Sequence, residues 1–414
     1  VDVRSIFEAP TVEALAARLA ASAEESDDRP ALSAGARPDR LPLSAAQQRL
    51  WFVNRFDPQS AVYNIPFAIR ITGDIHGDAL EEALADVIAR HEVLRTIYVD
   101  SADGPSQVIR AISDVQFSVE RYRGSEGIES ATTEFAARGF DLGSDLPIRA
   151  MLVREDTFAH VLVVVIHHIA FDGWSLTPFA TDFVAAYSAR VVGAAPVFTP
   201  LDVQYAYYAV WQQDSLGQVG DQESLVAREL TFWTTAMAGA PDEVLLPVDR
   251  PRGSVSTTAV GSVPIVIDAA TGERLAALAR RSGSTQFMVV HAILAVVLAR
   301  LGATDDVVVG TPVAGRGRPE LDSLIGMFVN SVPLRTPVDH RAPFTSLLEV
   351  VRERDLAAFA HPELPFEVLV DALDLDRSTT RHPLFQVMLS YHQNVVSPQV
   401  TVHDAHLEAQ ALEP

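Results

Sequence analysis

The chain of 414 residues contains no cysteine, which excludes disulfide bonds, thiol nucleophiles and thiolate metal sites. Positive charge is scarce, because the formal net charge is −22, and such a chain has little with which to neutralise the phosphates of nucleic acids. No amino-terminal segment combines a basic flank with an apolar core, so no signal peptide is predicted. Since the most apolar helical stretch, 287–301, is too short to span a bilayer, we expect a cytoplasmic protein that binds neither nucleic acid nor membrane.

Hydrophobic residues make up 48% of the chain, which indicates a globular protein. The length exceeds one ordinary core, so two lobes are expected, and helical and strand patterns in both halves predict an α/β (α+β) fold. A break near 217–222 separates the halves. The segment 22–40 is polar and interrupted by Pro30 and Pro38, which is typical of a linker. The predicted organisation is an arm at 1–21, a linker at 22–40, a first lobe at 41–216 and a second lobe at 217–414.

The strongest site signal follows the apolar run 161–166. There the sequence HHIAFDG at 167–173 indicates a buried strand that delivers two histidines and a carboxylate to a loop. Successive side chains of a strand point to opposite faces, so only one of His167 and His168 can face a cleft. Asp172 needs a partner if it is buried, such as an arginine, and Gly173 permits a sharp turn after it. The pattern predicts one reacting histidine, one structural histidine and one structural acid.

Two other interpretations of the same residues were weighed. The histidines could be ordinary core residues, with the aspartate as a helix cap. They could also be zinc ligands, but a metal site needs about three converging ligands, and side chains on opposite faces of a strand do not converge. We therefore predict no metal.

Six motifs, in this order, resemble those of the condensation domains of nonribosomal peptide synthetases, which belong to the chloramphenicol acetyltransferase-like superfamily. They are LSAAQQRLWF at 43–52, RHEVLRT at 90–96, HHIAFDGWS at 167–175, YAYYAVWQ at 205–212, IGMFVN with PLR within 325–335, and HPLFQVM at 382–388. In the fourth motif Tyr207 replaces the usual aspartate. In addition, the string IFEAPTVEAL at 6–15 resembles the last helix of a peptidyl carrier domain.

The resemblance implies two acetyltransferase-like lobes in a V-shaped pseudo-dimer, with the active site in the tunnel between them. It implies that His168 faces the tunnel as the catalytic residue and that His167 is structural. The other positions that match functional or supporting residues of the family are Asp172, Gly173, Trp174, Ser175, Arg90, Arg95, Trp211, Arg316 and Asn330. Which of Arg90, Arg95 and Arg316 pairs with Asp172 stays open.

The implied reaction is amide formation, in which the amine of the acceptor aminoacyl group attacks the donor thioester. Whether His168 acts as a base or as a positioner of the amine stays open. The implied partners are donor and acceptor peptidyl carrier domains and a neighbouring adenylation domain. No cofactor is expected to be bound covalently to this segment, because the substrates travel on the 4′-phosphopantetheine arms of the carriers.

The subtype follows from motifs that are absent. Dual epimerising relatives have an extra histidine-rich motif near the opening motif, but no histidine precedes His76. The carrier-like arm and short linker leave no room for an epimerisation domain, which favours an L-configured or glycyl donor. The alternatives are a D-configured donor, a coenzyme A-dependent acyltransferase, and a catalytically silent recruitment domain, whose members usually lose a motif histidine. Because the family normally continues well past the 382–388 motif, we expect a truncated second lobe.

Overall fold

The computed structural model describes residues 5, 9, 11–22, 30–102, 104–123, 127–249, 261–374, 381–392 and 399–410. The chain divides into two compact units, each made of three separate segments. The motif unit, which carries the double histidine, comprises Pro30–Asp214, Arg316–Val329 and Asn394–Pro414. The second unit comprises Val1–Arg29, Ser215–Gly315 and Asn330–Gln393.

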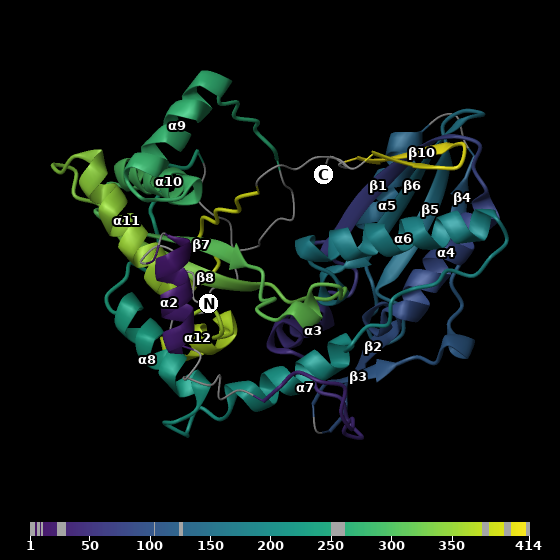
Figure 1. The fold of residues 1–414 in the computed structure, drawn as a ribbon, viewed down its shortest axis with the longest axis horizontal. Helices are drawn as coiled ribbons and strands as arrows, with labels where there is room; N and C mark the ends of the chain where they lie inside the picture. The colour runs from purple at the N-terminus through teal and green to yellow at the C-terminus, as the bar shows by residue number, and fades with distance from the viewer. Residues whose placement is uncertain are drawn as a thin grey trace. The chain divides into compact units, whose positions relative to one another are not determined.

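A six-stranded sheet forms the framework of the motif unit, with α6 running across one of its faces (Figure 1). Its strands are, in order across the sheet, β4 (Val119–Tyr122), β5 (Ile148–Arg154), β6 (Ala159–His167), β1 (Asn64–Gly73), β10 (Ala405–Gln410) and β9 (Gln399–Val402). Only β4 and β5 pair in parallel; the other neighbours are antiparallel. The centre of β6 is fully buried, which explains why its sequence is a continuous apolar run rather than an alternating one. This rigid strand fixes the position of the two histidines at its end.

Further helices, a second strand pair and several 3₁₀ turns complete the described part of the motif unit. They are α3 (Ala45–Phe56), α4 (Gly77–Arg90), α5 (Ile128–Ala137), α6 (Leu176–Val191), most of α7 (Tyr205–Leu216), the pair β2 (Thr96–Val99) and β3 (Ser106–Ile109), and the 3₁₀ turns η1 (Glu92–Arg95), η2 (Ile112–Asp114), η3 (His168–Ala170), η4 (Gly173–Ser175) and η5 (Pro319–Leu321). An edge-to-face contact of 5.3 Å between the rings of Phe67 in β1 and Phe179 in α6 holds that helix against the sheet.

The second unit is mainly helical. It contains α2 (Val12–Ser22), α8 (Leu225–Met237), α9 (Ala269–Arg281), α10 (Gln286–Leu301), α11 (Phe344–Phe359), α12 (Phe366–Ala372) and the antiparallel pair β7 (Asp306–Val313) and β8 (Asn330–Pro337). Within its core, Nδ1 of buried His291 in α10 lies 3.0 Å from Oδ1 of Asp355 in α11. No single described helix is long and apolar enough to cross a membrane. Helices α9 and α10 reach such a length and apolar composition only when taken together, and a bend of 105° separates them.

The two units differ from the continuous ranges 41–216 and 217–414 that the sequence suggests. The boundary near residue 214 agrees with the predicted break, but two later segments return to the motif unit. The last of them provides β10, which pairs with β1 over six residues and buries Leu407 opposite Ile71. Burial of apolar side chains and completion of backbone hydrogen bonds explain why this segment joins the first sheet.

The predicted arm and linker also take a different form from the one expected. The arm is helical over α2, but Val12 of its apolar stripe is 88% exposed, and most of the quoted 6–10 part lies outside the described residues. Its identity as a carrier helix therefore stays a prediction. In the linker, 23–29 lies outside the described residues, whereas Leu32 is buried in the core of the motif unit. The described part of the linker is thus an integral part of that unit.

Replacing Leu407 tests whether the carboxy-terminal strand stabilises the first sheet. Leu407→Ala should lower the free energy of unfolding by about 2–5 kcal/mol, because it opens a cavity beside β1. Chemical denaturation would measure this, with Leu245→Ala, at a position that is 72% exposed, as the control with little change. Equal stability of both variants would show that β10 contributes nothing to the sheet.

Candidate active site

His168 stands where β6 ends and η3 begins. Its backbone N–H donates to the carbonyl of Tyr63 (2.8 Å), and its Nδ1 lies 2.7 Å from the carbonyl oxygen of Phe171. A carbonyl oxygen only accepts, so Nδ1 must carry the proton, and the neutral ring has its lone pair on Nε2. No described residue forms a hydrogen bond with Nε2. The backbone therefore prepares Nε2 as an acceptor.

His167 has the opposite arrangement. Its Nδ1 accepts a hydrogen bond from the backbone N–H of Ile169 (3.1 Å), so the proton of the neutral ring is on Nε2. The side chain is 1% exposed and packs edge-on against Phe140, with ring centroids 5.9 Å apart. The adjacent histidines thus lie in different surroundings, as expected for neighbours at the end of a strand.

Burial keeps both rings neutral. It lowers the pKa of His167 to about 3, with further lowering from His168 and Arg149. Burial also lowers the pKa of His168, against the opposing effects of the Phe171 carbonyl and the Asp172 carboxylate. Because an unfolded chain protonates such rings near pH 6.5, the native state is destabilised as the pH falls below that value. At neutral pH, His168 is available as a proton or hydrogen-bond acceptor.

Asp172 is fully buried, and four hydrogen bonds satisfy its carboxylate. Oδ1 accepts from the backbone N–H of Ser175 (2.9 Å), the hydroxyl of Ser175 (2.8 Å) and the guanidinium of Arg316 (3.2 Å). Oδ2 accepts from the backbone N–H of Phe328 (3.0 Å). Of the three arginines that the sequence left open, the structure therefore pairs Arg316 with Asp172.

Arg316 and the chain that follows it complete this network. Arg316 also donates to the hydroxyl of Ser175 (2.9 Å) and lies over the ring of Phe328, with its Cζ 4.2 Å from the centroid. The backbone N–H of Gly326 donates to the same hydroxyl (3.0 Å). A Cβ at Gly326 would lie 2.2 Å from the ring of Tyr205, so only glycine fits there. The segment Arg316–Val329, which we call the docking loop, thus secures the turn after His168.

A second network, which the sequence analysis did not single out, links α3 and α7 to the same region. The hydroxyl of Tyr205 donates to the carbonyl of Met327 and lies 2.8 Å from the hydroxyl of Ser44. The amide of buried Gln47 donates to the carbonyl of Ile169 (3.3 Å), inside the histidine motif. Ser44, Gln47 and Tyr205 lie in the opening and fourth motifs. The Ser-x-x-Gln spacing of the first two also predicts a capping box, which the structure forms at the start of α3.

The other two candidate arginines lie elsewhere in the motif unit. Arg90 donates through Nε to Asp182 of α6 (2.8 Å), and Arg95 donates to the carbonyl of Arg110. Neither has a hydrogen bond with Asp172. Arg90 ties α4 to α6, and Arg95 ties η1 to the chain after β3, so their contacts are those of structural supports.

Asn330, Trp211 and Trp174 are the remaining candidates for supporting roles. Asn330 belongs to the second unit, where its amide donates to the carbonyl of Pro362 (2.9 Å). Trp211 donates its indole N–H to the carbonyl of Pro30 (2.6 Å). Trp174 follows Gly173 in η4 and is 40% exposed. Their proposed supporting roles stay predictions.

The expected glycine-dependent turn at Gly173 is not found. Gly173 does not have a left-handed backbone conformation, and a Cβ added there would meet no atom within 4 Å. Instead, Asp172 and Ser175 form a reciprocal capping box that turns the chain into η4.

In the described part of the chain, no three histidine or acidic side chains gather where they could hold a metal ion.

The fold and these networks define a two-unit α/β protein with a neutral, oriented histidine at the end of a buried strand. The chain belongs to the condensation-domain family, whose model matches residues 38–412. The chain is 43% identical over 94% of its length to CymA of Salinispora arenicola, a probable nonribosomal peptide synthetase of unconventional type. It is 39% identical over 98% of its length to a dimodular nonribosomal peptide synthase of Bacillus subtilis. The chain spans only 5% of the length of CymA and 17% of the length of the Bacillus subtilis synthase.

Solved structures agree with this assignment. The X-domain from teicoplanin biosynthesis is 34% identical, with a TM-score of 0.86 over 93% of this chain and 85% of that chain. A four-domain nonribosomal peptide synthetase with a TM-score of 0.78, of which the chain covers 30%, is 21% identical and supports the fold alone. The family and the α/β fold predicted from the sequence are confirmed.

Removing the carboxylate of Asp172 tests its structural role. Asp172→Ala should lower the free energy of unfolding by about 3–5 kcal/mol, because Arg316 is left as a buried charge without its partner. Arg70→Ala, which breaks the exposed ion pair with Glu155, is the control and should cost less than about 1 kcal/mol. Similar losses in the two variants, measured by urea denaturation, would contradict a buried network at Asp172.

The two tautomers can be observed directly. Nitrogen-15 spectra of the imidazoles should show the proton on Nδ1 in His168 and on Nε2 in His167 at pH 7. Because the pKa of each ring is lowered, neither should protonate until the pH is below about 6.5. A proton on Nε2 of His168 would contradict the geometry at Phe171.

Proposed function

We propose that the chain forms a peptide bond by transferring a donor aminoacyl or peptidyl group from an upstream carrier to a downstream aminoacyl amine. The acceptor nitrogen attacks the thioester carbonyl carbon, and the tetrahedral intermediate then collapses. The C–N bond forms, the C–S bond breaks, and the proton lost from nitrogen goes to the departing thiolate. The observation that carries this proposal is the neutral ring of His168, with its proton held on Nδ1 by Phe171.

The lowered pKa of His168 favours one division of labour. A free α-amine has a pKa of about 8, so an imidazole with a pKa below its usual value is a weak base toward the ammonium form. It is nevertheless mainly neutral at pH 7, because burial lowers its pKa, and it can accept a hydrogen bond from the free amine. As the C–N bond forms, the nitrogen becomes more acidic, and Nε2 can then take its proton and pass it to sulfur. We propose that His168 positions the amine first and carries its proton afterwards.

The proposed partners are donor and acceptor peptidyl carrier domains and a neighbouring adenylation domain. The relatives are far longer than this chain and are named as peptide synthetases, which supports a place among other domains. No cofactor is proposed to be bound covalently to this segment, because the 4′-phosphopantetheine arms belong to the carriers. An L-configured or glycyl donor is proposed, since the carrier-like arm leads through a short linker into the opening motif.

A second candidate is a recruitment domain without catalysis. The specific observation for it is the similarity to the teicoplanin X-domain, which has also been solved in complex with OxyB. Against it stands the arrangement of His168, because a domain that only binds a partner has no need of an oriented imidazole with an available Nε2. Peptide formation is therefore the better-supported function.

Reconstitution with two loaded carriers tests these alternatives. The wild-type protein should form dipeptide from an L-aminoacyl or glycyl donor at least about tenfold faster than from the D-donor, as followed by mass spectrometry. His168→Ala should reduce the rate by about 10²–10⁴-fold without unfolding, because it removes the proton acceptor. His340→Ala, an exposed histidine of the second unit, is the control. Equal rates for wild type and His168→Ala would contradict the catalytic role, and a preference for the D-donor would contradict the proposed stereochemistry.

A further inference from the structure

The turn that carries His168 is also held by a buried side chain of α3, that of Gln47. The side-chain amide of Gln47 donates to the carbonyl of Ile169 (3.3 Å), the residue directly after His168. The same amide donates to the hydroxyl of Tyr98 (3.0 Å). Gln47 and Ile169 have no exposed surface. Since a buried carbonyl without a hydrogen bond is costly, the contact with Gln47 fixes the position of the Ile169 peptide.

The start of α3 fixes the direction in which the Gln47 amide donates. Its Oε1 accepts from the backbone N–H of Ser44 (3.2 Å), which leaves the two hydrogens of the amide nitrogen for Tyr98 and Ile169. In return, the hydroxyl of Ser44 accepts from the backbone N–H of Gln47 (3.2 Å), and the two residues form the capping box that begins α3. A flipped amide would lose all of these contacts.

Ile169 matters for the chemistry because it is the central residue of η3. Its backbone N–H donates to Nδ1 of His167, and its carbonyl accepts from Gln47, so side chains hold this residue on both sides. The turn closes when the N–H of Phe171 donates to the carbonyl of His168 (3.3 Å), and it brings the carbonyl of Phe171 to Nδ1 of His168 (2.7 Å). A rotation of the Ile169 peptide would therefore disturb the contact that keeps the proton on Nδ1.

We propose that Gln47 is a positioning residue for peptide-bond formation, since by holding the Ile169 carbonyl it keeps Nε2 of His168 unprotonated and available to the acceptor amine; this rests on the proposed function. Gln47 has no exposed surface, so it touches neither substrate and acts only through His168. Its loss should therefore lower kcat and leave KM for both loaded carriers unchanged.

The first variant removes the donor. Gln47→Met keeps nearly the length of the side chain but has no hydrogen to give to the Ile169 carbonyl. It should lower kcat for dipeptide formation about 10–100-fold, because displacement of a reacting group by about 1 Å can cost about 100-fold. In nitrogen-15 spectra at pH 7, part of the His168 population should carry the proton on Nε2 instead of Nδ1.

A second variant restores a donor. Gln47→Glu keeps the shape of the side chain, and burial favours its protonated form, whose O–H can donate to the Ile169 carbonyl. At about pH 6 its kcat should be several-fold higher than that of Gln47→Met, and the proton of His168 should stay on Nδ1. If Gln47→Met does not fold, Gln47→Glu decides alone, because a slow but folded Gln47→Glu at this pH would contradict the proposal.

Tyr98→Phe is the control for stability. It removes the other acceptor of the same buried amide but leaves the contact between Gln47 and Ile169 in place. The variant should therefore lose stability without a change in kcat or in the position of the His168 proton.

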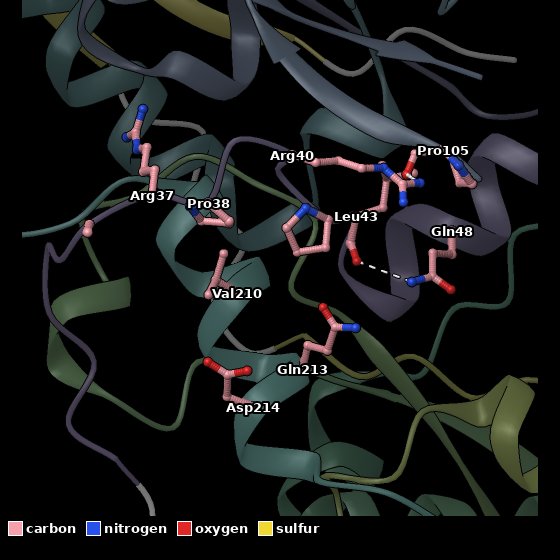
Figure 2. Close-up of a pocket in the computed structure, with 11 residues that line it drawn as sticks. Arg37, Pro38, Arg40, Leu43, Gln48, Pro105, Val210, Gln213 and Asp214 are labelled. Atoms are coloured by element: carbon pink, nitrogen blue, oxygen red, sulfur yellow. Dashed lines mark hydrogen bonds between the residues drawn. The ribbon is translucent and has the colours of Figure 1, made fainter. Parts of the chain in front are cut away.

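Gln48→Met is the matched control for the substitution itself. Gln48 is the next residue of α3, but it is exposed and lines a hollow of about 810 Å³ beside α7 (Figure 2). Figure 2 shows that its amide donates to the carbonyl of Leu43 (3.3 Å) and not to the histidine motif. This variant should change neither kcat nor the His168 spectrum.

Three results would overturn the proposal. Wild-type kcat in folded Gln47→Met would show that the Ile169 contact does not position His168. A lower kcat with the His168 proton still wholly on Nδ1 would show that Gln47 acts in another way. An equal fall of kcat in Tyr98→Phe would assign the effect to general packing. Absence of dipeptide with the wild-type protein would contradict the proposed function instead, while the spectra of wild type and Gln47→Met would still decide whether Gln47 sets the proton position.

Discussion

The buried contact between Asp172 and Arg316 is the constraint on which the active-site region depends. A carboxylate with no exposed surface is costly unless all its hydrogen-bonding positions are filled. Here Ser175, Arg316 and the backbone of Phe328 fill them. The turn after His168 can therefore exist in this form only while the docking loop is in place. The same turn presents the Phe171 carbonyl, which fixes the tautomer of His168.

Because of this dependence, residues that are far apart in the sequence build the site together. The docking loop lies between β7 and β8, both of which belong to the second unit, yet its own contacts are with the motif unit. The carboxy-terminal strand β10 behaves in the same way, since it completes the first sheet beside β1. The first half of the sequence contains His168 and Asp172 but lacks Arg316 and Phe328, which complete the hydrogen bonds of Asp172. A fragment ending near residue 214 would leave Asp172 buried without Arg316, or exposed and unable to set the turn.

The sequence predicts the local features of this site better than the long-range ones. Strand alternation predicted that His167 and His168 have different surroundings, because that depends on two adjacent residues. The partner of Asp172 was not predictable, since Arg90, Arg95 and Arg316 were all candidates, and the correct one is 144 positions away. The return of β10 to the first sheet is likewise a nonlocal pairing that no local pattern encodes. The prediction that the turn depends on Gly173 was wrong, because the capping box of Asp172 and Ser175 makes that turn.

The segment 22–40 shows why composition alone misjudges a linker. Its polar residues and prolines are typical of a free tether, but Leu32 and Arg37 each find a specific partner on the motif unit. Single contacts of this kind contribute on the order of 1 kcal/mol each, far less than the burial that holds β6. The described residues 30–40 are therefore attached to the motif unit at a few specific points. Because Arg37 lies between the ring of Tyr207 and the carboxylate of Glu92, Tyr207 gives a residue of the predicted linker a partner at a position where the family usually has an aspartate.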